Sequence, residues 1–196
     1  METQPHRAPD RTTSRAGFFR GAGIAFAGAT ALGAARFASA ADRDQDALNL
    51  LLTVEYAEVG LYSAALEADR ITGELRAYAE TVLGQEREHL AALRQTLGAA
   101  AVAEPRQDFA EATRSAEAFA DAAGRLEDLA VSAYNGQATE VSKQAFVAAA
   151  TIVSVEARHA AWIRSIVDRP PAPDATDSPL NANEVRAGLR ELGVEL

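Results

Sequence analysis

The stretch that decides the fold is residues 152–163, IVSVEARHAAWI, in which apolar residues recur with the period of a helix. Ile152 and Ile163 belong to one stripe, but Glu156 and His159 fill the positions between them, where the period requires apolar side chains. Because these two residues are three apart, they lie on one face of the helix, one turn from each other. A carboxylate and an imidazole on the apolar face of a helix indicate a chemical site within the core.

The same interruption occurs on three other segments of the chain. The interrupting residues are Glu55 between Leu52 and Val59, Glu86 and His89 between Val82 and Leu93, and Glu127 between Ala123 and Ala130. Glu86-x-x-His89 returns seventy residues later as Glu156-x-x-His159, and Tyr62 follows Glu55 by seven residues as Tyr134 follows Glu127. This internal repeat predicts two related helical hairpins that face each other.

Turn signals divide residues 43–168 into four helical segments without internal proline. The signals are Ile71-Thr72-Gly73, residues 98–108 with Pro105, and Asn135-Gly136. The third helix is predicted to begin at Phe109 with Asp108 as its N-cap, and Thr139 is the predicted N-cap of the fourth. The segments predict an all-α fold, an antiparallel four-helix bundle with a long central connection.

Residues 169–196 are predicted to form a tail outside the four helices. The proline-rich stretch 170–173 ends the fourth helix and forms a stiff linker. A short C-terminal helix is predicted to start at Ser178-Pro179 and to contain Val185, Leu189 and Leu192. We expect this helix to pack on the bundle or on a partner subunit. In the second case the protein would be a homo-oligomer.

Residues 1–40 are predicted to be an export signal peptide. Five arginines surround an apolar run over residues 21–35, which is too short to span a membrane, and Ala38-Ser39-Ala40 gives a small-x-small cleavage pattern. Residues 14–20, SRAGFFR, resemble a twin-arginine export signal, except that Ala16 occupies the second arginine position. We expect the protein in the periplasm or at the cell exterior, with no membrane span after processing.

The composition excludes several classes of chemistry. The chain has no cysteine, which excludes disulfides, thiolate metal sites, iron–sulfur clusters and cysteine nucleophiles. Its formal net charge is -9, which argues against a nucleic-acid partner.

Four buried carboxylates need positive charge, because an unpaired buried ion loses several kcal/mol of solvation. No Lys or Arg lies on these stripe positions, whereas two divalent cations would neutralise four glutamates. One Glu from each of two helices with Glu-x-x-His from each of the other two is the ligand set of di-iron and dimanganese carboxylate bundles. The predicted metal ligands are Glu55, Glu86, His89, Glu127, Glu156 and His159, and the predicted cofactor is two iron ions, with two manganese ions as the alternative.

On these motifs, residues 48–167 resemble the ferritin-like superfamily, with the ligand pattern of bacterioferritin and rubrerythrin. LNLLLTVEYAEVGLYSAAL (residues 48–66) and IVSVEARHAAWI are most similar to its exported group, which includes the plant desiccation-related proteins. The resemblance implies Glu55 and Glu127 as terminal ligands, Glu86 and Glu156 as bridging carboxylates, and His89 and His159 on one metal each. It also implies Tyr62 and Tyr134 as tyrosines near the site, which makes them candidate catalytic residues.

Several alternatives stay open at this point. Glu58, three residues after Glu55, is an alternative ligand in its place. The favoured function is an oxidoreductase that acts on Fe(II), dioxygen or peroxide, as a ferroxidase, a peroxidase or a manganese catalase-like enzyme. The alternatives are metal binding or storage without turnover, and a stress-related structural protein that metals merely stabilise.

Overall fold

The computed structural model describes residues 31–196, with side chains from Arg43 onward except that of Gln144. Five α-helices account for most of this range, and the described residues contain no β-strand, only an isolated bridge between Gln107 and Val194. The helices are α1 (Ala31–Ala68), α2 (Gly73–Leu97), α3 (Ala116–Gln137), α4 (Lys143–Ile166) and α5 (Ala182–Glu191), with a 3-10 turn, η3 (Gly98–Ala100), after α2. The predicted all-α fold class is therefore confirmed.

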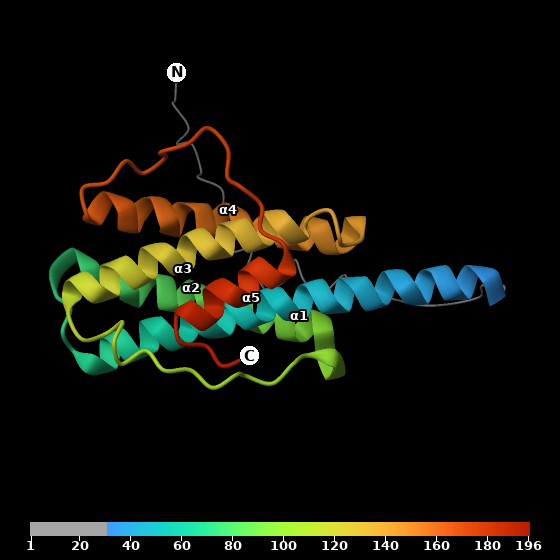
Figure 1. Cartoon of the computed structure of the whole chain (residues 1–196), viewed down its shortest axis with the longest axis horizontal. Helices are drawn as coiled ribbons and strands as arrows, with labels where there is room; N and C mark the ends of the chain where they lie inside the picture. Colours follow the sequence, from blue (N-terminus) through green and yellow to red (C-terminus); the bar gives the residue numbers. More distant parts are fainter. Residues whose placement is uncertain (1–30) are drawn as a thin grey trace, which may run out of the picture.

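Helices α1 to α4 form two antiparallel hairpins, α1 with α2 and α3 with α4, laid against each other (Figure 1). The connection from η3 to α3 runs back along the bundle, so that α2 and α3 point in the same direction (Figure 1). As a result, the four stripes identified in the sequence face one shared interior.

The start of α1 overlaps the predicted signal peptide. Residues 1–30 of that segment lie outside the described residues, and residues 31–40 form the first turns of α1, which extends past the other helices (Figure 1). The prediction of export stays a prediction.

The third helix does not begin where the sequence predicted. It starts at Ala116, and Ser115 is its N-cap, accepting a hydrogen bond from Ala118 N. Asp108 instead pairs with the end of the chain: its backbone N–H donates to Gly193 O at 2.9 Å. Phe109 is buried, but in a turn that precedes the helix. The prediction of Asp108 as the N-cap of this helix was wrong: the Asp108 side chain accepts from Ala110 N in the turn that precedes Ser115, and the helix begins only after that turn.

The turn between α3 and α4 was also misplaced. Asn135 and Gly136 lie inside α3, and Ser142, not Thr139, caps α4 by accepting from Ala145 N. A β-carbon on Gly136 would lie 1.8 Å from the carbonyl oxygen of Leu180. The glycine therefore allows the tail to approach α3 closely, and it does not mark a turn.

Helix α5 packs on its own bundle, against α3 and α1. Val185 and Leu189 are fully buried there. The helix begins later than Ser178-Pro179, after Asn181, whose side chain forms a capping box with Glu184. This tail covers the outer side of the bundle, so it contributes to the fold and not to the interior site.

By length and composition alone, Ala145–Ile166 could also cross a membrane. In the structure this segment is a helix of the bundle, and it directs Glu156 and His159 into the interior.

Candidate metal centre

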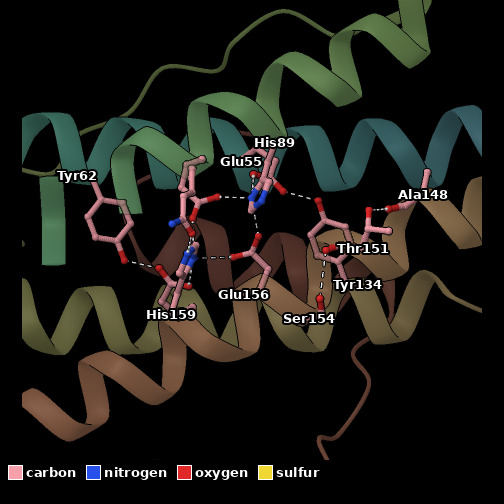
Figure 2. A network of polar contacts seen from close by, with 12 residues as sticks. Glu55, Tyr62, His89, Tyr134, Ala148, Thr151, Ser154, Glu156 and His159 are labelled. Carbon is pink, nitrogen blue, oxygen red and sulfur yellow. Dashed lines mark hydrogen bonds and ion pairs between the residues drawn. The ribbon is translucent and has the colours of Figure 1, made fainter. Parts of the chain in front are cut away.

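All six residues predicted as metal ligands meet in the middle of the bundle (Figure 2). Each of the four long helices supplies a glutamate, and α2 and α4 also supply a histidine. The four glutamates have no exposed surface, His159 is 3% exposed and His89 is half-buried. A set of carboxylates so completely removed from water requires compensating positive charge.

The helical spacing brings each histidine against the glutamate one turn before it. His89 Nδ1 lies 2.9 Å from Glu86 Oε2, and His159 Nδ1 lies 3.4 Å from Glu156 Oε2. Each imidazole also reaches across to the opposite hairpin, with His89 Nδ1 2.8 Å from Glu156 Oε1 and His159 Nδ1 2.8 Å from Glu86 Oε1. Glu86 and Glu156 therefore each contact both histidines.

These atoms form two overlapping sets of possible ligands. One contains Glu55, Glu86, His89 and Glu156, and the other contains Glu86, Glu127, Glu156 and His159; within each set, one ligand atom per residue lies within 4.8 Å of the others. Glu86 and Glu156 belong to both sets. The arrangement offers two neighbouring positions for metal ions, linked by two shared carboxylates.

The donor atoms fit a bound cation better than a hydrogen-bond network. Several of them are buried without any hydrogen bond: Glu55 Oε2, Glu86 Oε1, Glu127 Oε2, both oxygens of Glu156, and His159 Nδ1. His159 Nδ1 and Glu86 Oε1 lie close together, yet their geometry is not that of a hydrogen bond. Buried carboxylate oxygens that converge without hydrogen-bond donors, beside an imidazole nitrogen that can lose its proton, are suitable ligands for a divalent metal ion.

The protonation of the cluster depends on its own ion pairs. Burial raises the pKa of Glu127 to about 7, against the opposing contacts with His159, and it raises the pKa of Glu55 well above the ordinary range. Burial acts in the same direction on Glu86, but its close contacts with the His159 and His89 imidazoles outweigh burial and lower its pKa to about 2. Without metal, the imidazoles are held protonated, with the pKa of His159 raised to about 12 by the surrounding carboxylates against the effect of burial. Protons thus stand where cations would bind, so metal uptake must release them.

Glu55 and Glu127, the outer glutamates, each belong to only one of the two ligand sets. Each of them accepts a hydrogen bond from a tyrosine. The Tyr62 hydroxyl donates to Glu127 Oε1, and the Tyr134 hydroxyl donates to Glu55 Oε1 (Figure 2). Burial raises the pKa of both hydroxyls well above its ordinary value, so both stay protonated as donors. The structure therefore places the two predicted tyrosines beside the cluster, where they orient its carboxylates.

Three further residues belong to this centre. Tyr78 lies 2.8 Å from the Tyr62 hydroxyl and donates to Glu127 Oε1 at 3.3 Å. Gln85 Oε1 lies 2.7 Å from His159 Nε2 and fixes the orientation of that ring. Glu58 is fully buried, as Glu55 is, but Glu55 joins a set of possible ligands and Glu58 does not.

Sequence reasoning missed Tyr78 and Gln85. Tyr78 precedes Glu86 by eight residues, a spacing that returns to the same helix face and could have identified it. Gln85 has no such signal, because it reaches the site only through a contact between α2 and α4.

Comparison with known proteins agrees with this architecture. A family model described as a ferritin-like domain matches residues 43–169, which covers the four long helices from Arg43 onward. No curated protein matches the chain.

Proposed function

The chain belongs to the ferritin-like domain family, and we propose that it is an exported di-metal protein that acts as an oxidoreductase on Fe(II), dioxygen or peroxide. The observation that carries the proposal is the pair of ligand sets that share Glu86 and Glu156. Such a pair of positions is the arrangement found in carboxylate-bridged metal pairs.

The metal pair we propose is iron, with manganese as the alternative. Glu55, Glu86, Glu127 and Glu156 would hold it together with His89 and His159. When bound, such a pair supplies the electrons with which dioxygen or peroxide is reduced. Among the described side chains, no Lys or Arg forms an ion pair with these glutamates, so the balancing charge is left to the histidines or to metal ions.

The residues of the chain have three tasks in this proposal. Glu86 and Glu156 contact both halves of the cluster and would hold the two positions together. Tyr62 and Tyr134 orient the outer glutamates through their hydroxyls. The apolar bundle excludes bulk water, which keeps the carboxylates preorganised for a cation.

Turnover of Fe(II) and peroxide tests the proposal. The purified chain is supplied with Fe(II) without oxygen; dioxygen or peroxide is then added, and Fe(III) formation is followed by absorbance and peroxide by its consumption. Glu86→Ala should abolish turnover because it removes a carboxylate shared by both positions. Glu88→Ala is the matched control, because Glu88 is an exposed residue of the same helix.

Rates for Glu86→Ala equal to those of the unchanged chain would contradict the proposal. If the unchanged chain binds metal but turns over neither substrate, the protein stores or binds metal instead, or uses metal to stabilise a structural bundle.

A further inference from the structure

Glu58 is a buried carboxylate that the six predicted ligands do not account for. It lies on α1 one turn after Glu55, its exposed fraction is 0%, and neither of its carboxylate oxygens has a hydrogen-bond partner. The other fully buried glutamates each have a histidine within reach, and Glu58 has none among the described side chains. When ionised, Glu58 would therefore carry the least compensated charge among the buried glutamates.

The charged groups that act on Glu58 come from all four helices of the bundle. The main ones are Glu55 on α1, Glu86 on α2, Glu127 on α3 and Glu156 on α4, which are all carboxylates. Burial is the main cause that raises the pKa of Glu58, and repulsion by these four groups acts in the same direction. Glu58 thus belongs to the same acidic interior as the metal ligands.

Neither protonation state of Glu58 is satisfied by the chain itself. An ionised carboxylate would be an unpaired charge in a low-dielectric interior, and a protonated one would have no acceptor for its O–H. A cation between Glu58 and the neighbouring carboxylates would supply the missing partner.

The internal repeat has no acid at the position that corresponds to Glu58. Glu55 corresponds to Glu127 and Tyr62 to Tyr134, each 72 residues later, and the residue 72 after Glu58 is Ala130. Ala130 is fully buried as well, so the equivalent position in the other hairpin holds a methyl group. The acid is an addition to one half of the site.

We infer that Glu58 is a further ligand of the metal pair, so that five carboxylates and two imidazoles surround it and its two halves are not equivalent. This inference rests on the proposed di-metal function. It extends the ligand set beyond the two sets of converging atoms, and it makes α1 the source of two ligands.

The test is a titration of the metal-free full chain with Co(II), followed by calorimetry and by the visible absorption of the bound ion. Glu58→Gln keeps the shape of the side chain and removes its charge, and Glu58→Ala reproduces the residue found at Ala130. Both should weaken Co(II) binding by about tenfold or more and change the absorption spectrum. Glu88→Gln, on the exposed face of α2, should leave both unchanged.

Melting of the metal-free variants separates a ligand from a structural role. Removing an uncompensated buried acid should leave the melting temperature unchanged or raise it, so weaker Co(II) binding would not come from a damaged fold. Identical isotherms and spectra for the unchanged chain and both Glu58 variants would overturn the inference and leave the proposed function standing. If the unchanged chain takes up no Co(II), the inference about Glu58 and the proposed di-metal function fail together.

Discussion

The two halves of the candidate metal centre share one plan. In the Glu55 half (Glu55, His89 and Tyr134), His89 Nδ1 lies 3.6 Å from Glu55 Oε2, and a tyrosine hydroxyl donates to the same glutamate. In the Glu127 half (Glu127, His159 and Tyr62), the corresponding distance from His159 Nδ1 to Glu127 Oε2 is also 3.6 Å, with a tyrosine again as donor. The sequence repeat thus reproduces the ligand positions.

The surroundings of the two halves differ. Tyr78 and Gln85 support Glu127 and His159, whereas the residues seventy positions later, in the other hairpin, are Ala148 and Val155, which offer no side-chain hydrogen bond. The side chain of His89 is 11% exposed and that of His159 is 4% exposed. Because partners of the ligands orient them for metal, we expect the Glu127 half to bind its ion more tightly, even with Glu58 as an additional ligand on the α1 side.

The largest effect should come from removing one histidine at a time. His89→Ala and His159→Ala should each lower the metal content by about one ion per chain, because each imidazole serves only one ligand set. The ion left in His89→Ala should dissociate more slowly than the ion left in His159→Ala. Elemental analysis and chelator competition measure both quantities, and loss of both ions from each single variant would show that the halves are not separable.

Proton binding should make the metal-free chain less stable as the pH rises. The pKa of Glu127 is about 7 in the folded chain and near 4.5 when unfolded, so the folded chain binds more protons between these values and stability falls across that window. The raised pKa of His159 acts with the same sign above about 6.5. Together with Glu55, this should lower the melting temperature by roughly 5–10 °C between pH 5 and 7.

Metal should reverse this dependence, because its ligands bind in their deprotonated forms. The stabilisation that metal gives should therefore grow from pH 5 to 7. Thermal melts with and without metal measure the two slopes, and a metal-free chain that gains stability over this range would contradict the assigned protonation states.

Removal of the tyrosine hydroxyls should affect the two halves unequally. Tyr134→Phe leaves Glu55 Oε1 without a hydroxyl donor, whereas Glu127 keeps Tyr78 in Tyr62→Phe. We expect metal affinity to fall about tenfold in the first variant and several-fold less in the second. Calorimetric titration measures the difference, and equal losses would mean that Tyr78 does not support the Glu127 half.

The smallest effect should come from Gln85, which touches a ligand and not the metal. Gln85→Leu removes the partner of His159 Nε2 and should bring the dissociation rates of the two ions closer together. Val155→Gln, at the equivalent position of α4, should also reduce the difference between the two dissociation rates, because the new amide would give His89 a hydrogen-bond partner. Rates that respond to neither change would show that these partners do not cause the asymmetry.

The fold and the cluster could be predicted because helical periodicity is local. A polar residue on an apolar stripe must face the interior, so Glu55, Glu127 and the two Glu-x-x-His motifs could be found without knowing how the helices pack. The internal repeat then showed that Glu55 corresponds to Glu127 and that the two Glu-x-x-His motifs correspond to each other.

What the sequence could not predict depends on contacts between distant segments. Aspartate is a common N-cap, but the Asp108 side chain caps only a short turn before α3, and the Asp108 backbone N–H donates to Gly193 O near the C-terminus. Gly136 suggested a turn because local patterns do not show the close approach of Leu180. Gln85 contacts His159 only because α2 packs against α4. The complete burial of Glu58 likewise results from the packing of all four helices.

The most direct test of a di-metal site is elemental analysis of the full chain purified without chelators, beside the His89→Ala/His159→Ala double variant. The account predicts about two iron or manganese ions per chain and almost none in the double variant, with helical content retained in both. No metal in either protein, with the same helicity and melting temperature, would contradict it and leave a bundle whose buried acids serve another purpose.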